Sequence, residues 1–574
     1  MIAGVVLSAM ERAIDPPSAE EQARLDALDA HLARTFPPGR GADLEARGEF
    51  PDEALRAFAA EGFAREIVPE QEGGCLDWSR AMRVGMRLAA HDVDLALCLG
   101  GAVLGGMPLL VAGNGAQRAQ YFSALLNGEM GALALSEWEH GSDLLAIDAR
   151  AEPLDAKGAP CAAKDAVGFR LFGTKSPANN GSRGANVVVL ARTGAVGDPF
   201  GASLFLVARA TPGVKSVPRF DSVGFRSMDL SGVALDGAEV PRGMLIGNAG
   251  EGFTYARRSL EVSRSGVASM SVGAHAQCLA MALAHARSRV LYGKPIGALE
   301  GVQSILGRVY ARFAEAVALA RRASRSAARW PGSARAWTAA AKLVCPRLLE
   351  ESVHDVGTLL GARSLVGPQD FARLRRTAPV FAIFDGSSQL QLDELWRHAG
   401  QWPTDATLAA AAALTLGRSL RDPRHVPFDA SREDTTGELD RATPGALLRA
   451  LDETLPGVGL GTLADVAGVV ALAARDGRSF GQALRFRISE ATASLFAIAS
   501  LAEATALAEG ATRAAVEAAL ARRVSTVAPA LAATLVGLEP KVSGAAEQGA
   551  RALLLARDDE ARCAAAHAAA LRLA

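Results

Sequence analysis

The spacing of apolar positions changes twice along the chain, from helical to strand-like and back. In residues 1–130, apolar side chains recur every three or four positions, as at Leu25 and Leu28, which predicts a helical N-terminal domain. In residues 131–248, short β-branched or alternating runs such as Val187–Ala191 lie between Gly, Asn and Asp, which predicts a middle antiparallel β domain.

Helical spacing returns after the β domain in two blocks. Residues 249–401 contain long stretches rich in Ala and Arg, which predict a C-terminal helical domain. Residues 402–444 hold four prolines and a polar run, a composition suited to a linker. Residues 445–574 are dense in alanine, with apolar positions at core-like spacing, and predict an extra helical domain. The fold class we expect is therefore α+β.

Composition narrows the class of protein. A chain of 574 residues exceeds what one hydrophobic core organises, so two to four domains are expected. The net charge of -1, from 61 basic and 62 acidic residues, gives no field to attract nucleic acid. The six cysteines are scattered without a C-x-x-C pair, which argues against a disulfide framework or a metal site. The start of the chain lacks a basic secretory region, and no unbroken apolar run of about 18 residues is apparent, so we expect a cytoplasmic protein without a membrane partner.

Candidate chemistry is concentrated in the segment Phe384 to Gln391, where one acid, Asp385, stands beside Gly386. By itself an aspartate before glycine is commonly a helix N-cap or a turn residue. Three further segments change that weighting: Ala134–Asp143, Gly173–Gly181 and Arg289–Ile296 each combine glycine with polar side chains that can approach a cofactor closely.

Together these four segments, in this order across the helical, β, helical succession, resemble the acyl-CoA dehydrogenase superfamily over roughly residues 15–400. The C-terminal extension gives a layout similar to very-long-chain acyl-CoA dehydrogenases. The resemblance implies FAD as cofactor and an acyl thioester of CoA or a carrier protein as substrate. It also implies an electron-transfer flavoprotein or another electron acceptor, and assembly into a homodimer or homotetramer.

The resemblance also assigns roles to residues. Asp385 stands where the family's glutamate removes the proton next to the thioester carbonyl, and it is one methylene shorter. Arg264 matches the family's active-site arginine; an alternative base position just before it is occupied by Ser263, and Glu261 is our second choice of base.

The implied binding residues fall into two sets. Those for FAD are Leu135, Ser136, Gly141, Ser142, Asn179, Arg289, Tyr292, Gln303, Ser387 and Gln389, of which Arg289 serves a neighbouring subunit. Those for the substrate are Ser142, Glu261, Arg264 and Gly386. The chain departs from the family pattern at Trp138, Pro177, Glu300, Thr358 and Ala362, which predicts an altered flavin environment and a specialised substrate.

Two alternatives remain open. Nitroalkane oxidases share this fold and use an aspartate at the matching position, with an arginine seven residues later where this chain has Leu392, so an oxygen-using flavoenzyme is one alternative. A catalytically silent scaffold is the other. For the extension, which lacks a Lys-rich amphipathic helix with Trp or Tyr, we expect a packing or dimer-stabilising role.

Overall fold

The computed structural model describes residues 2–366, 370–402, 428–430, 432, 443–452, 454–455, 458, 460–476, 481–508, 513–514, 516–525 and 527. The chain forms two compact units. We call residues 1–29, 264–425 and 432–574 the helical unit, and residues 30–263 and 426–431 the β unit. The division falls within α2 (Ala19–Thr35) and α8 (Gly252–Ser288).

The β unit contains a set of helices whose starts are marked by capping side chains. Asp77 accepts a hydrogen bond from the Arg80 amide at 3.0 Å, and Asn114 and Gln117 form a capping box. Such caps satisfy backbone amides that have no partner inside the helix. The helices are α3 (Arg40–Arg47), α4 (Asp52–Ala60), α5 (Trp78–His91), α6 (Val93–Ala112) and α7 (Gly115–Leu126).

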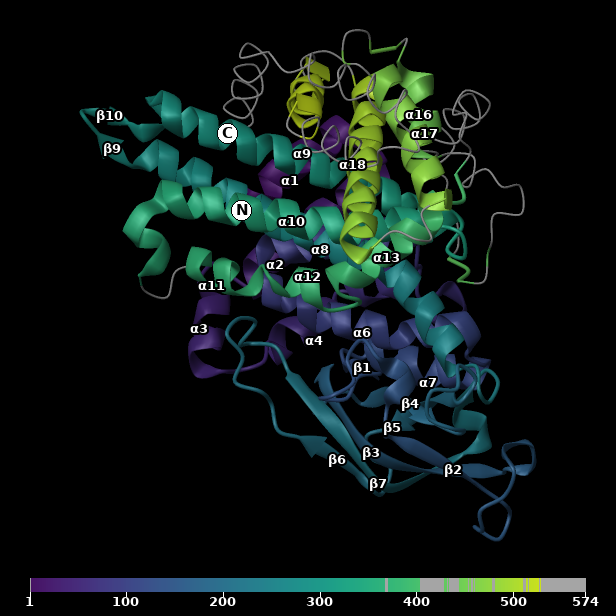
Figure 1. The fold of residues 1–574 in the computed structure, drawn as a ribbon. Coiled ribbons are helices and arrows are strands. Elements are labelled where there is room, and N and C mark those ends of the chain that lie inside the picture. Colours follow the sequence, from purple (N-terminus) through teal and green to yellow (C-terminus); the bar gives the residue numbers. More distant parts are fainter. Residues whose placement is uncertain are drawn as a thin grey trace. The chain divides into compact units, whose positions relative to one another are not determined.

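The sheet of the β unit has eight strands in the order β6-β7-β3-β2-β4-β5-β8, with β1 paired to β4 (Figure 1). The strands are β1 (Gly131–Ala134), β2 (Arg150–Leu154), β3 (Gly168–Asn179), β4 (Asn186–Arg192), β5 (Ala202–Ala208), β6 (Val214–Val217), β7 (Leu230–Pro241) and β8 (Leu245–Ile246). Their inward side chains, including Phe169, Val189 and Phe205, are fully buried in one core.

The prediction of an antiparallel sheet was wrong in part, because the sheet is mixed. β1 pairs with β4 in parallel, from Gly131 beside Asn186 to Ala134 beside Val189, and β2 and β4 also meet in parallel at Arg150 and Arg192. Parallel partners require a long connection, which here runs through β2 and β3 before the chain returns. Short apolar runs reveal a strand but not its direction.

Two described helices, α6 and α8, are long and apolar enough to cross a membrane, which contradicts the expectation of no such run. However, 67% of the apolar window of α6 and 83% of that of α8 are buried inside the protein. α6 packs against β1, α5 and α7 within the β unit. A helix that is apolar all round is expected where protein covers it on all sides, so burial accounts for this composition.

The helical unit is built around α9 (Glu300–Arg329) and α10 (Arg335–Leu360), which lie side by side in Figure 1. The other helices up to residue 402 are α1 (Ile2–Ile14), α11 (Asp370–Thr377), α12 (Val380–Ile383) and α13 (Ser388–Ala399); a small hairpin is formed by β9 (Val290–Leu291) and β10 (Lys294–Pro295). α10 packs against α12 and α13, and this packing positions the segment that contains Asp385.

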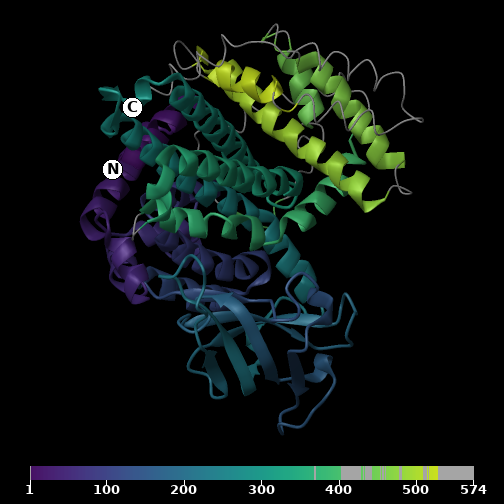
Figure 2. The same cartoon turned by 60° about the vertical axis from the view of Figure 1, so that its left-hand side comes forward.

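Three later helices belong to the same unit: α16 (Pro444–Leu451), α17 (Leu460–Asp476) and α18 (Gln482–Leu507). Figure 2 shows them side by side in green and yellow, and α18 packs on α9, α10 and α13. A buried ion pair joins Arg322 of α9 to Glu503 of α18 at 2.5 Å, while the guanidinium of Arg322 also lies 4.6 Å from the Trp337 ring centroid. Most of the predicted linker 402–444, and residues 528–574 of the predicted extra domain, lie outside the described residues.

Candidate active site

The segment around Asp385 is a tight turn between two helices. α12 ends at Ile383, and the next two turn residues after Phe384 both have left-handed backbone, with φ of 57° at Asp385 and 89° at Gly386. The N-cap of α13 is Ser387, two residues after Asp385, so Asp385 does not cap the helix. A left-handed aspartate is uncommon, and such backbone strain concentrates at functional positions.

The side chain of Gln391 stabilises the turn and is completely buried. Its Nε2 donates to the Gly386 carbonyl at 3.1 Å. A Cβ at Gly386 would stand 2.7 Å from the same Nε2 atom, closer than real Cβ contacts allow. The positive φ therefore favours glycine at position 386, and a larger residue would also have to displace the Gln391 amide.

Two buried cations belong to the same region. The Nη2 atom of Arg264 would lie 4.0 Å from a Cβ at Gly386, and the Nε and Nη1 atoms have no hydrogen-bond acceptor among the described residues. Lys342 of α10 is 1% exposed, and its Nζ donates to the Phe381 carbonyl at 2.7 Å. Burial lowers the pKa of Lys342 to about 8, against the attraction of Asp385. The turn therefore carries an acid in a field of positive charge.

In the β unit, Glu137 and Lys175 join two of the segments identified in the sequence. The fully buried Lys175 donates from Nζ to Glu137 Oε1 at 2.8 Å and to the Leu135 carbonyl at 2.9 Å. Glu137 also accepts from the amides of Asp148 and Ala149 at 2.7 and 2.9 Å. Burial opposes ionisation of Glu137, but these hydrogen bonds and the Lys175 charge outweigh it and lower its pKa.

This clamp fixes the loop that carries the predicted flavin residues. Ser136 is half-buried and its carbonyl accepts from the Ser176 amide at 3.1 Å, while Gly141 and Ser142 are exposed. The backbone of Glu137 and His140 pairs in both directions, so Trp138 lies at the tip of a turn. Trp138 is 71% exposed and stacks on Phe220, with the ring centroids 5.4 Å apart. Its indole ring is therefore not part of a buried lining.

Asn179 supplies an unsatisfied acceptor in the same unit. Its Nδ2 donates to the Leu97 carbonyl at 2.7 Å, which leaves Oδ1 buried without a donor among the described residues. A buried polar atom of this kind costs free energy unless a ligand or water meets it. Glu261, the second choice of base, is 4% exposed and accepts from Arg257 Nη1 at 2.8 Å on the same helix.

Arg289, Tyr292 and Gln303 form a group of their own in the helical unit. Tyr292 and Gly293, with φ of 53° and 77°, make the turn of the β9–β10 hairpin, and Tyr292 is 90% exposed. Gln303 donates from Nε2 to the Gly297 carbonyl at 3.1 Å. Arg264 and Arg289 are separated by nearly all of the rest of α8, which at 1.5 Å per residue is about 36 Å. One chain cannot bring both arginines to the same site.

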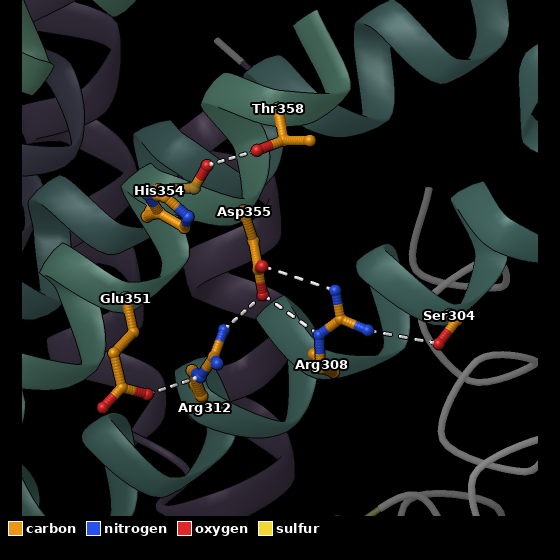
Figure 3. Close-up of polar contacts among 7 residues, drawn as sticks. All are labelled: Ser304, Arg308, Arg312, Glu351, His354, Asp355 and Thr358. Atoms are coloured by element: carbon orange, nitrogen blue, oxygen red, sulfur yellow. Dashed lines mark hydrogen bonds and ion pairs between the residues drawn. The ribbon is translucent and has the colours of Figure 1, made fainter.

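In the helical unit, α9 and α10 are joined by the polar network drawn in Figure 3. Arg308 donates from Nε and Nη2 to the two oxygens of Asp355 at 3.1 and 3.3 Å, and Arg312 donates from Nη1 at 2.7 Å. Burial alone would raise the pKa of Asp355, but the two arginines lower it. The Thr358 hydroxyl donates to the His354 carbonyl at 3.3 Å, so it hydrogen-bonds within its own helix, α10.

Sequence reasoning missed four residues of these arrangements. Glu137 and Lys175 were present in the quoted segments without a role, although a lysine within the predicted β domain could have suggested a buried partner of opposite charge. Gln391 closes the Asp385 segment and was likewise given no role, and Lys342 had no signal at all, since it stands 39 residues before its partner Phe381. Ser387 and Gln389 follow the turn, the first as the N-cap of α13 and the second exposed.

The residue types suit a flavin dinucleotide. Asn179 offers a buried acceptor that still has capacity, Ser136 a half-buried hydroxyl, and Arg289 an exposed guanidinium matched to phosphate oxygens. These residues belong to two units and to two separate groups, so each group is compatible with one portion of such a cofactor.

Two regions of the chain match models of a known protein family. Residues 18–129 match the model of the acyl-CoA dehydrogenase N-terminal domain, and residues 250–400 match that of the acyl-CoA dehydrogenase C-terminal domain. An acyl-CoA dehydrogenase of Bacillus subtilis is 27% identical over 355 residues, covering 61% of this chain and 89% of that protein. The bovine mitochondrial short-chain specific acyl-CoA dehydrogenase is 28% identical, covering 67% and 91%.

Solved structures show the same fold. An acyl-CoA dehydrogenase from Bacillus anthracis, complexed with FAD, has a TM-score of 0.75 at 18% identity and covers 97% of this chain and 95% of its own. Butyryl-CoA dehydrogenase from Megasphaera elsdenii has a TM-score of 0.61 at 22% identity, covering 66% and 97%. The predicted succession of a helical, a β and a second helical region is confirmed.

Proposed function

Because the chain belongs to the acyl-CoA dehydrogenase family, we propose that it is an FAD-dependent oxidoreductase that converts an acyl thioester to its 2-enoyl thioester. The thioester is one of CoA or of a carrier protein, and Asp385 is the base. A bound FAD would supply the hydride acceptor for the β-hydrogen of the substrate, while the α-proton goes to the base, so that the acyl chain loses two electrons and two protons overall.

The residues of this chain supply the proton-transfer half of the reaction. Asp385 accepts the α-proton, and removal of that proton requires the carboxylate to be ionised. Arg264 lies near the turn with two buried nitrogen donors that no described residue uses, and it orients the carboxylate or the thioester. We infer that backbone N–H groups of this left-handed turn polarise the thioester carbonyl.

The observation that supports this proposal most strongly is the left-handed pair Asp385 and Gly386, buttressed by Gln391 and lying near Arg264. An aspartate reaches less far than a glutamate, and a misplacement of 1 Å can cost about 100-fold in rate.

The test is an anaerobic titration of the holoenzyme with panels of acyl-CoA and acyl-carrier-protein thioesters. Loss of the oxidised flavin absorbance, together with formation of the enoyl thioester, is the expected result. Thioesters that leave the flavin fully oxidised across both panels would refute the proposal. An apoprotein that takes up no FAD would instead favour a silent scaffold.

The oxygen-using alternative gains no support from position 392. Leu392 is 6% exposed on α13, so a buried apolar side chain stands where nitroalkane oxidases have an arginine. Peroxide release with a nitroalkane, and none with thioesters, would reverse this preference. For electrons from acyl thioesters we propose an electron-transfer flavoprotein as the acceptor, tested by its reduction in the coupled assay.

We also propose that the protein self-assembles, as a homodimer or homotetramer, through the β9–β10 hairpin. Val290 and Tyr292 are 54% and 90% exposed, and Arg289 is about 36 Å along α8 from Arg264. An exposed apolar hairpin next to candidate cofactor residues suits a neighbouring copy of the chain. Light scattering of the wild type against Tyr292→Ser tests this: a monomeric wild type with full FAD content would refute it.

A further inference from the structure

Lys342 carries a charge that the packing of a buried helix residue does not require. It is 1% exposed and belongs to α10, yet its Nζ reaches the Phe381 carbonyl of α12 at 2.7 Å. Burying an ammonium group is unfavourable unless it is paired and hydrogen-bonded. A methionine of similar length would fill the same space without burying a charge. The charge of Lys342 is therefore explained by what it contacts, and its contacts lie around Asp385.

The Phe381 carbonyl is one of those that the end of α12 leaves without a helical partner. The helix spans Val380–Ile383, and its next hydrogen bond would need the amide of Asp385 in helical conformation. Asp385 has φ of 57°, so helical conformation does not continue through it, and Lys342 donates to the Phe381 carbonyl from another helix. Lysine is well suited to such a C-terminal carbonyl, because its charge also matches the negative end of the helix.

The charge of Lys342 also acts on the turn itself. Among charged groups Asp385 affects Lys342 most strongly, followed by Arg264 from α8 and Glu350 from α10. The Nζ atom lies 5.9 Å from the centroid of the Phe384 ring, the residue directly before Asp385. The hydrogen bond of Lys342 therefore acts on Phe381 in α12, and its charge acts on Asp385, four residues later in the turn.

Resting on the proposed function, we propose that Lys342 is a positioning residue for Asp385. Its ammonium group caps α12 through the Phe381 carbonyl, which fixes where the left-handed turn begins, and its positive charge favours the ionised carboxylate. Lys342 does not touch the substrate. It acts through Asp385 alone, in the half of the reaction that moves a proton.

The first experiment isolates proton abstraction from oxidation. The probe is 3,3-dimethylbutyryl-CoA, which has α-hydrogens but no β-hydrogen, so the holoenzyme can exchange its α-hydrogens with D2O and cannot pass a hydride to the flavin. Exchange is followed by NMR from pH 5 to 10. The variants are Lys342→Met, Lys342→Arg and, as a matched control, Lys215→Met, whose exposed Nζ pairs with Asp236.

Lys342→Met should slow exchange at neutral pH by about 10- to 100-fold, and its acidic limb should move to higher pH, because a cation beside the carboxylate is lost. In the wild type the rate should decline as Lys342 loses its proton near its pKa of about 8. Lys342→Arg should retain the neutral rate and lose that decline, because an arginine stays protonated. A Lys342→Met profile that superimposes on those of the wild type and Lys215→Met overturns the proposal.

A second measurement needs no catalysis. Amide hydrogen exchange of the segment 380–391 should quicken by about 10-fold or more in Lys342→Met, as expected for a local opening, while α18 keeps its protection. Unchanged protection of 380–391 refutes the capping role, and equal loss in α18 shows a general instability that also refutes it. Absence of α-hydrogen exchange in the wild type would overturn the proposed function, whereas this measurement would still decide the capping by Lys342.

Discussion

The two buried lysines, Lys175 in the β unit and Lys342 in the helical unit, have similar environments and different partners. Burial lowers the pKa of each to about 8. Lys175 meets a carboxylate and a carbonyl, and that carboxylate, of Glu137, is itself held by two amides. Lys342 donates to the Phe381 carbonyl near an acid in a strained turn.

The difference separates a structural charge from one that serves a site. Around Lys175 every element of the clamp is satisfied by the protein itself, which is how a buried network rigidifies a fold. Around Lys342, some hydrogen-bonding groups are not satisfied. Arg264 Nε and Nη1 and Gln391 Oε1 are buried without a hydrogen-bond partner among the described residues. Unused donors and acceptors at such a place are what a ligand can satisfy.

The strongest test of the comparison is Asp385→Asn. We expect turnover of the best thioester to fall by about 1,000-fold, near 4 kcal/mol in the barrier, because the α-proton has no acceptor. FAD content and melting temperature should stay at wild-type values. Stopped-flow flavin reduction provides the rate, and a rate within 10-fold of the wild type would remove Asp385 from the mechanism.

Lys175→Met tests the other half of the comparison. It leaves Glu137 buried without its cation, and breaking a buried pair in this way costs about 3 kcal/mol of the free energy of unfolding. Denaturant unfolding measures the loss, with Lys215→Met as the exposed control, expected within about 0.5 kcal/mol. Equal stabilities of the two variants would contradict a structural role for the clamp.

Gly386→Ala tests the backbone of the turn. Left-handed backbone costs an L residue about 1–2 kcal/mol, and the new Cβ would also meet Gln391 Nε2. We expect that loss in unfolding free energy together with slower flavin reduction. In the matched double variant Gly386→Ala, Gln391→Ala the clash is removed and the strain remains. An alanine variant with wild-type stability would show that the turn is not strained.

The smallest effect concerns pH and the Glu137 clamp. Burial alone would raise the pKa of Glu137, but its hydrogen bonds lower it below the unfolded value, so its contribution to stability is present at neutral pH and is lost as pH falls through the folded pKa. Glu137→Gln should therefore flatten the dependence of unfolding free energy on pH below about 4.5. Parallel curves for the variant and wild type between pH 3 and 6 would contradict this.

Much of the architecture could be predicted because its signals are local. Helical spacing around Leu25 and Leu28 and the alternating runs of β4 reflect backbone repeats that any neighbourhood imposes. The direction of β1 beside β4 could not be predicted, since the same residues fit either direction and the intervening β2 and β3 decide it. The apolar composition of α6 had the same ambiguity, because protein and lipid can both cover it.

The sequence by itself determined the order of the regions and indicated the family through the four segments, and it predicted Asp385 as the candidate base. Tertiary structure alone decided that Asp385 is left-handed, that Gln391 and Lys342 support its turn, that Glu137 pairs with Lys175, and that Arg289 belongs to a different place from Arg264. The physical reason is distance along the chain. Lys342 and Phe381 are 39 residues apart and Glu137 and Lys175 are 38 apart, so no local periodicity records their contacts, and only packing brings them together.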